Sequence, residues 1–181
     1  MAHDVVFARN VFAPELPRLR SVLEQLPGAN LPPRLLNVGC GAYLCARTLH
    51  GARPGWARYG LDWRAAALRE AHEREPDLRL VQADARELPG LLHTRFGLVL
   101  ARHPDLYRQR AAWAVILPAL LDLLAPGGVL LVTVYGAEEI ELLDTWALPP
   151  GPPLDHTLLA PVDLAGQDRF VLAFAPKAHY H

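Results

Sequence analysis

Short apolar runs alternate with helix-forming segments from residue 34 to residue 148, and this order limits the possible folds more than any other feature. The expected strands are 34–38, 57–62, 78–84, 96–102 and 127–135; the expected helices are 42–51, 64–75, 106–124 and 137–148, with a short helical turn at 85–92. Strands that are apolar throughout, each followed by a helix, form a parallel sheet with helices on both faces. The sequence therefore predicts a doubly wound α/β fold. Pro118 is expected to kink the longest helix.

The carboxyl-terminal part of the chain breaks this alternation. Residues 156–162 and 168–176 have the composition of strands, and only the five residues 163–167 separate them. A connection this short permits an antiparallel hairpin but not a parallel crossover. The predicted fold is therefore a Rossmann-like sheet of five parallel strands, closed by a C-terminal antiparallel hairpin.

Length and composition indicate one folded domain. The chain has 181 residues, of which 51% are hydrophobic, and this is enough for a single substantial core. We divide the domain into an N-terminal helical segment at 1–32, with a helix at 14–26, a core at 33–175 and a tail at 176–181.

Charge, cysteine content and hydropathy exclude several classes of function. The net charge of −1 gives no electrostatic footprint for nucleic acid, although a local basic patch would still allow such a partner. Cys40 and Cys45 are too few for a disulfide framework and are expected to be reduced thiols. Residues 1–10 lack the pattern of a signal peptide, and no apolar segment reaches the roughly 20 residues that cross a bilayer. We therefore expect a cytoplasmic protein without a membrane partner.

Candidate ligand-binding residues follow the first three strands. Ligands of open α/β sheets bind at the carboxyl ends of the strands, near the point where strand order reverses. Gly39 and Gly41 follow the first strand, and without Cβ atoms they let a ligand approach backbone amides, although a tight turn alone also favours glycine. Asp62 ends the second strand, where a carboxylate can accept hydrogen bonds from both hydroxyls of a ribose. Asp84 ends the third strand, where its carboxylate can accept a hydrogen bond from the exocyclic amino group of an adenine.

Each carboxylate also has a purely structural interpretation, because aspartate caps helices and turns. Three such positions in sequence order nevertheless favour a nucleoside cofactor. A dinucleotide is disfavoured, because its binding motif requires Gly or Ala where this chain has Leu44, after the bulky Tyr43. The chain is also short for a dehydrogenase with its own substrate domain.

These segments resemble the class I S-adenosylmethionine-dependent methyltransferases over about residues 33–175. The resemblance rests on "LLNVGCG", "YGLD", "VQADARELP", "FGLVLARHPDLY" and "LAPGGVLLVTVY". It implies S-adenosylmethionine (SAM) as cofactor, with Gly39 and Gly41 along its methionine and ribose part. It further implies that Asp62 holds the ribose hydroxyls and that Asp84 and the Ala85 amide read the adenine edge. We assign four neighbouring residues to the same cofactor site: Asn37, Cys40, Trp63 and Arg102.

Two positions depart from the pattern of the family. Asn37 stands where the family often has Asp or Glu, and a neutral amide contacts the ammonium group of the cofactor less strongly than a carboxylate does. Tyr43 stands where the family has a third glycine, and we expect it to cover one side of the cofactor.

The segment after the fourth strand, "ARHPDLY", holds the candidate catalytic residues. His103 can remove a proton from an acceptor hydroxyl or amine near neutral pH. Asp105 is expected to orient His103 or to bind a cationic substrate, and Tyr107 to line the pocket. In the alternative interpretation, Pro104 and Asp105 only begin the long helix and His103 is a surface histidine. Two candidate ligands do not make a metal site, so none is predicted.

The hypothesis favoured by the sequence is methyl transfer to a small-molecule acceptor. The segment "ARHPDLY" after the fourth strand lacks the Asn/Asp-Pro-Pro-Tyr motif of enzymes that methylate nucleic-acid bases or protein glutamine. Residues 147–156 are expected to shape the acceptor site, and the chain is a candidate homodimer. If residues 7–16 form a lid, Arg9 meets the cofactor carboxylate; an exposed, solvated Arg9 is the favoured interpretation. Two alternatives stay open: an inactive cofactor-binding protein that acts as a sensor or partner, and, more weakly, an NAD(P)-dependent oxidoreductase.

Overall fold

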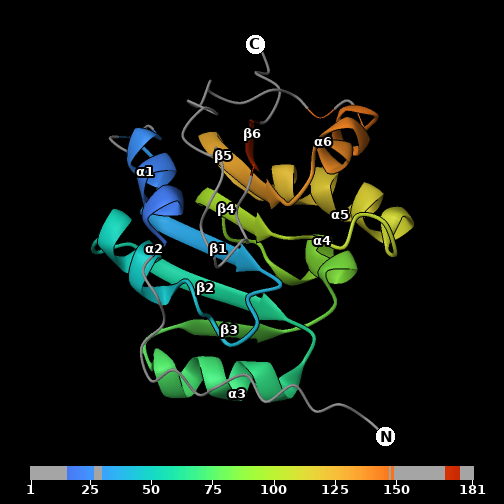
Figure 1. Ribbon diagram of the computed structural model, residues 1–181. Helices are drawn as coiled ribbons and strands as arrows, with labels where there is room; N and C mark the ends of the chain where they lie inside the picture. Colours follow the sequence, from blue (N-terminus) through green and yellow to red (C-terminus); the bar gives the residue numbers. More distant parts are fainter. Residues whose placement is uncertain (1–15, 27–29, 147, 149–169, 176–181) are drawn as a thin grey trace, which may run out of the picture.

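The computed structural model describes residues 16–26, 30–146, 148 and 170–175, and shows a sheet covered by helices (Figure 1). The strands are β1 (Arg34–Val38), β2 (Ala57–Asp62), β3 (Arg79–Gln82), β4 (Phe96–Arg102), β5 (Leu124–Val134) and β6 (Phe170–Phe174). The helices are α1 (Pro17–Gln25), α2 (Ala46–Ala52), α3 (Ala65–Arg74), α4 (Leu88–Leu91), α5 (Arg110–Asp122) and α6 (Ala137–Asp144), with a 3-10 turn η1 at Ala85–Glu87.

The strands form one sheet in the order β3-β2-β1-β4-β5-β6. Strands β1 to β5 are mutually parallel, and β6 is antiparallel to β5, with Val134 opposite Phe170. This confirms the predicted fold class, a doubly wound sheet of five parallel strands with an antiparallel closing strand. The first strand of the expected hairpin, 156–162, lies outside the described residues. Strand order reverses between β1 and β4, so the ligand site is expected at the carboxyl ends of these two strands.

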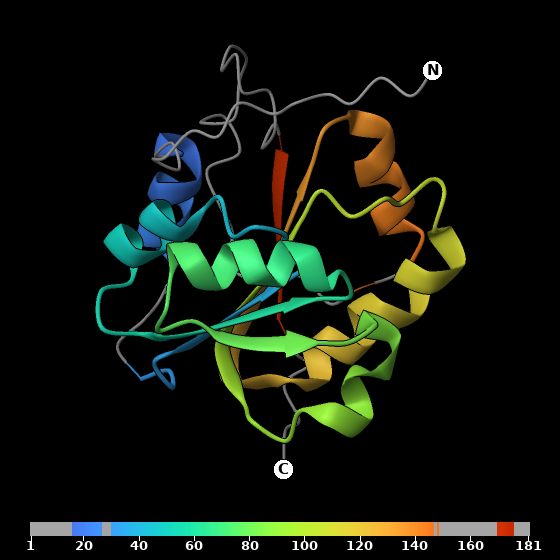
Figure 2. The ribbon, with the colours of Figure 1, turned by 90° about the horizontal axis from the view of Figure 1, so that it is seen from below.

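Successive residues of each central strand face opposite layers of the core. Leu35 packs in the layer under α1, α2 and α3, whereas Leu36 packs in the layer under α4, α5 and α6. Figure 2 shows α3 lying across β2 and β3, with α1 and α2 beside it. Because both faces of the sheet are covered at its centre, β4 and β5 are largely apolar runs, whereas β2 and β3 near the edge carry Arg58 and Arg79 and are partly exposed.

Helix α1 belongs to the core and packs beside α2. Leu19, Val22 and Leu23 are fully buried, and the Leu16 N–H donates a hydrogen bond of 2.8 Å to the Thr48 hydroxyl on α2. None of the helices in the described part of the chain is long and apolar enough to span a membrane.

Several element boundaries differ from the sequence prediction for local reasons. Helix α2 begins at Ala46 rather than at residue 42, because Gly41 and Tyr43 have φ values of +54° and +56°, which no right-handed helix accepts. Strand β5 begins at Leu124 rather than at residue 127 and contains an irregularity in its register with β4. Gly127 lies there with φ +76°. Helix α5 continues through Pro118 to Asp122, so the proline does not end it.

Candidate functional site

The glycine turn after β1 leaves open space at the point where strand order reverses. Gly39 has φ +65° and Gly41 has φ +54°, a region that residues with a Cβ rarely adopt. A Cβ added at Gly39 would meet no atom within 4 Å. Packing therefore does not require glycine here, and the bare backbone faces space that a ligand can fill.

Asp62 ties the end of β2 to this turn. Its carboxylate is 2% exposed and accepts four hydrogen bonds. Oδ2 accepts from the Gly41 N–H at 2.9 Å and from Arg64 Nη2 at 3.1 Å, and Oδ1 accepts from the Arg64 N–H at 2.9 Å and from Arg64 Nε at 3.0 Å. Burial raises the pKa of Asp62, but these hydrogen bonds outweigh it, so the net pKa lies below the usual value. Asp62 is therefore a fixed carboxylate beside the glycine turn.

Asp84 follows β3 and is more exposed. Its side chain pairs with the Arg86 guanidinium and accepts a 2.9 Å hydrogen bond from the Arg86 N–H. Asp84 is thereby the N-cap of η1, whose first residue is Ala85. These hydrogen bonds hold the pKa of Asp84 at about 2. The capping role named as the alternative is thus present, and the charged carboxylate still reaches solvent.

Asn37 carries a buried polar atom that has no hydrogen-bond partner among the described residues. Its Nδ2 donates a 3.3 Å hydrogen bond to the Cys45 Sγ, while its Oδ1 is buried and accepts no hydrogen bond from the described residues. Buried oxygens of this kind usually have a donor. Asn37 lies on β1, two residues ahead of Gly39, so an orphan acceptor stands next to the open turn.

Cys40 and Tyr43 pack into the core from the same turn. Burial raises the pKa of the Cys40 thiol to about 12, so the thiol stays protonated and is a poor nucleophile. Its Sγ fills the place where a Cβ on Gly60 would come within 2.9 Å. Tyr43 is fully buried, so the expectation that it covers a bound cofactor is wrong: with φ +56° its ring belongs to the core under α1 and α2.

Four exposed apolar side chains lie in the segments that follow parallel strands. Trp63 follows β2 and is 72% exposed, while Leu44, Tyr107 and Tyr135 follow β1, β4 and β5 and are also exposed. Such side chains in the loops after parallel strands are typical of a ligand site. Leu44 and Tyr135 were not among the predicted site residues, although each lies close after a strand end.

His103 follows β4 and stacks on Tyr135. The two ring centroids are 4.1 Å apart with planes at 31°, and the His103 N–H donates to the Thr133 carbonyl at 3.0 Å. His103 has φ +49° and is partly buried rather than on the open surface. Arg102, at the end of β4, lies opposite Thr133 in the sheet and is also partly buried.

Two acidic residues hold the loops around His103. The Asp105 carboxylate accepts a 3.1 Å hydrogen bond from the Arg108 N–H and so holds the turn ahead of α5. The alternative interpretation, in which Pro104 and Asp105 begin the long helix, is wrong, because α5 begins at Arg110 with Gln109 as its N-cap. Glu139 on α6 is buried and accepts from the N–H groups of Tyr135 and Gly136 at 2.7 Å and 3.0 Å. It fixes the loop that carries Tyr135, a role the sequence analysis missed, although Glu at the third position of a helix is a capping signal.

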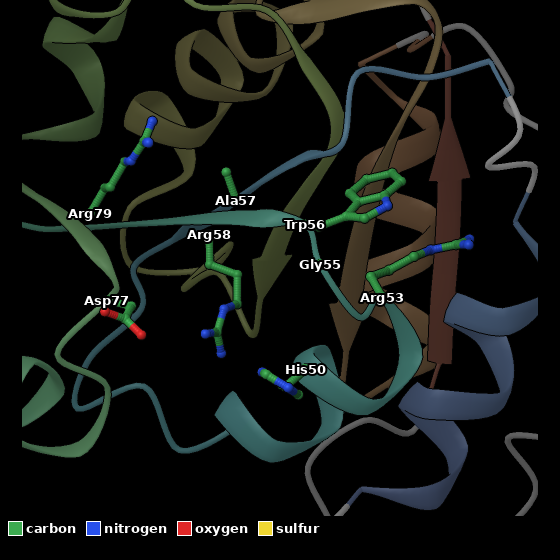
Figure 3. Close-up of a pocket in the computed structure, with 8 residues that line it drawn as sticks. All are labelled: His50, Arg53, Gly55, Trp56, Ala57, Arg58, Asp77 and Arg79. Atoms are coloured by element: carbon green, nitrogen blue, oxygen red, sulfur yellow. The ribbon is translucent and has the colours of Figure 1, made fainter.

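A pocket of about 260 Å³ lies at the opposite edge of the sheet, around the amino ends of β2 and β3 (Figure 3). It is lined by His50, Arg53, Gly55, Trp56, Ala57, Arg58, Asp77 and Arg79. Arg53 donates to the carbonyls of Leu23 and Leu26 at the end of α1, and Arg58 pairs with Glu75 at 2.8 Å. The predicted ligand site lies at the carboxyl ends of the strands, so this pocket at the amino ends is a separate feature.

Other predicted features fall outside what the structure describes. The described residues leave out 7–15 of the expected lid at 7–16, including Arg9, most of the expected acceptor loop at 147–156 and the tail at 176–181. Within the described part of the chain, no group of three His, Cys, Asp or Glu side chains could hold a metal ion.

Comparison with known proteins gives a family match over half of the chain. Residues 35–128 match the model of a methyltransferase domain. This stretch begins on β1 and ends in β5, so it contains the glycine turn, Asp62, Asp84 and His103. No curated protein matches the chain.

Solved structures share the fold. The SAM-bound CalS10, an amino pentose methyltransferase from Micromonospora echinaspora, is 27% identical with a TM-score of 0.53, over 68% of this chain and 49% of CalS10. This chain thus spans about half the length of CalS10. A TehB-like SAM-dependent methyltransferase from Corynebacterium glutamicum is 16% identical with a TM-score of 0.62, over 88% of both chains. An rRNA methylase from Streptococcus thermophilus is 15% identical with a TM-score of 0.59, over 88% of this chain and 92% of that protein. At these last two identities the likeness shows the fold alone.

Proposed function

The chain belongs to the methyltransferase domain family, and from this premise we propose that it transfers a methyl group from SAM to a small-molecule acceptor. One observation carries the proposal: the open glycine turn and the Asp62 carboxylate are joined by the 2.9 Å hydrogen bond from the Gly41 N–H. They meet at the carboxyl ends of β1 and β2, next to the point where strand order reverses between β1 and β4, and this class of sheet binds its ligands near that point.

The residues at this edge fit the cofactor. The space at Gly39 accommodates a ligand against bare backbone, and Asp62 supplies a fixed carboxylate for two ribose hydroxyls. Asp84 supplies a second carboxylate toward which an exocyclic amino group can donate. The orphan Oδ1 of Asn37 is an acceptor next to the place where an ammonium group would lie.

The chemistry needs little from the protein beyond position and proton removal. SAM supplies an electrophilic methyl group on a sulfonium centre. The protein has to hold an acceptor in line with that methyl group, and such positioning is a large part of the rate enhancement. His103, stacked on Tyr135, is the proposed base that takes the proton of an acceptor amine or hydroxyl. Both of its ring nitrogens are buried, so this role requires the loop around His103 to open when the acceptor binds. Trp63, Tyr107 and Tyr135 offer apolar surface for the acceptor.

We infer the class of the acceptor from the net charge of the chain and from one structural neighbour. The chain has a net charge of −1, which disfavours a polyanionic acceptor. CalS10, an amino pentose methyltransferase, supports an acceptor of the size of a sugar. We therefore propose a small amine or alcohol rather than nucleic acid.

Replacing Gly39 by alanine is expected to weaken SAM binding by at least about tenfold, which corresponds to roughly 1.4 kcal/mol. The reason is that the new Cβ would occupy the open space in front of the turn. Gly55 is a matched control, because it also has a positive φ, +78°, and open space around it but lies at the opposite edge. Gly55→Ala should carry the same backbone strain and leave binding unchanged. Equal affinities of the two variants in a calorimetric titration would contradict this use of the turn.

Replacing His103 by alanine is expected to leave SAM binding intact and to lower kcat by about 100-fold, the usual contribution of a general base. The measurement is transfer of label from methyl-tritiated SAM to a panel of small amines and alcohols. His93→Ala is the control, since His93 is exposed and lies ahead of β4, away from the carboxyl edge. Wild-type protein that binds SAM but labels no acceptor in the panel would favour the inactive sensor or partner protein.

A further inference from the structure

We propose that Arg64 determines the affinity of the cofactor site. Its guanidinium occupies the hydrogen-bonding positions of Asp62 that a ribose would use, and it leaves these positions when SAM binds. The proposal rests on the proposed function of this edge. It concerns a residue that the sequence analysis did not assign to the site.

The hydrogen bonds of Asp62 are the first step of the argument. A carboxylate offers about four lone-pair positions, and in Asp62 all four are taken, by Arg64 Nε, Arg64 Nη2 and the N–H groups of Gly41 and Arg64. Two ribose hydroxyls cannot be added to this set. Two of the four donors must therefore leave when a ribose binds.

Only the guanidinium of Arg64 can leave without unfolding the turn. The two backbone N–H groups are fixed, because one belongs to the glycine turn and the other to the residue that precedes α3. The Arg64 side chain, in contrast, is 52% exposed and can swing into solvent. Its Nε and Nη2 contact one carboxylate oxygen each, so the guanidinium presents the same pair of donors that the two hydroxyls of a ribose present.

The position of the Arg64 side chain agrees with this exchange. A Cβ added at Gly41 would lie 3.5 Å from Arg64 Nη2, so the guanidinium covers the glycine turn as well as Asp62. A ligand that lies along Gly39 and Gly41 and reaches Asp62 meets Arg64 on its path. Binding of SAM therefore costs the release of a charge-assisted, two-pronged pair.

Asp84 shows why the proposal concerns Arg64 alone. The Asp84–Arg86 pair has the same spacing of two residues, but both partners are exposed to solvent, the carboxylate to 35%. Both oxygens of Asp84 accept hydrogen bonds from Arg86, but a solvent-exposed pair is screened and contributes little. A ligand therefore displaces Arg86 from Asp84 at little cost.

The test uses Arg64→Met, which keeps the length of the side chain and removes every donor. SAM and S-adenosylhomocysteine are expected to bind roughly five- to tenfold more tightly to this variant than to the wild type, the effect of one partly exposed charged pair. The Tm of the free protein is expected to fall, because Asp62 loses two donors, while the rise in Tm on adding SAM becomes larger. A lower Tm of the free protein together with a larger rise in Tm on adding SAM supports the proposal. If Arg64 had a purely structural role, the Tm and the rise in Tm would both fall.

Two further variants keep the test decisive. Arg69→Met removes an exposed arginine from the same helix, α3, and should leave the affinity unchanged. Arg64→Lys keeps the charge but lacks the two-pronged fork; it is expected to bind SAM more tightly than the wild type and decides the question if Arg64→Met does not fold. Unchanged or weaker binding by the folded Arg64 variants, with SAM still bound by the wild type, overturns the role of Arg64 and leaves the proposed function standing. Absence of SAM binding in the wild type and all variants removes the proposed function and this inference together.

Discussion

Replacing Asp62 by alanine is expected to weaken SAM binding by about 100-fold or more. A hydrogen bond to a charged group contributes roughly 1.5–3 kcal/mol, and the proposed site uses Asp62 for two such bonds with the ribose hydroxyls. The substitution also leaves the N–H groups of Gly41 and Arg64 without their acceptor, so the glycine turn loses its tie to β2. Calorimetric titration of the folded variant, with circular dichroism as the check of folding, measures the loss.

The control for this substitution is Asp77→Ala. Asp77 lines the pocket at the opposite edge of the sheet and should not affect SAM binding. Asp62→Asn keeps the shape of the side chain but loses the charge, so an intermediate affinity is expected. If Asp62→Ala binds SAM as tightly as Asp77→Ala does, the ribose is not held at Asp62.

Replacing Gly97 by alanine is expected to lower the free energy of unfolding by about 3 kcal/mol, a typical cost of forcing an atom into a packed interior. Gly97 lies in β4, and a Cβ there would stand 2.5 Å from the Pro32 carbonyl oxygen and 2.9 Å from the Leu31 Cβ. Neither is the flexible end of a side chain, so the backbone of the central strand or of the segment before β1 has to move. Urea denaturation measures the change.

Gly90→Ala is the matched control for this prediction. Gly90 lies in α4, and a Cβ there would meet no atom within 4 Å. Alanine is favoured over glycine in a helix by up to about 1 kcal/mol, so this variant should be as stable as the wild type or more stable. A similar loss of stability in both variants would show that the contact with Pro32 and Leu31 is not the cause.

The strands could be predicted well because burial on both faces leaves a plain record in the sequence. Strands β1, β2 and β4 have the predicted bounds: β1 and β4 are mainly apolar runs, and β2 ends at Asp62, directly before a helix-forming segment. The start of α2 could not be predicted, because the positive φ of Tyr43 is set by the core that receives its ring. The bulge in β5 likewise depends on pairing with a distant strand.

The candidate site was predictable in its residue types but not in its contacts. The glycine turn, Asp62, Asp84 and His103 lie at strand ends, as the sequence pattern indicates. The pair of hydrogen bonds from the Arg64 guanidinium to the Asp62 carboxylate was not predicted. A spacing of two residues in a loop does not determine the direction in which a side chain points. The stacking of Tyr135 on His103 joins residues from two neighbouring strand ends, and only the strand order makes them neighbours.

The central claim is that the carboxyl edge of the sheet binds SAM at the glycine turn after β1 and at Asp62, which ends β2. It is tested most directly by calorimetric titration of the wild-type protein with SAM, S-adenosylhomocysteine and NAD in parallel. We predict saturable binding of the two sulfur compounds at one site and no binding of NAD. Failure of both sulfur compounds to bind, or saturable binding of NAD in their place, would contradict the claim.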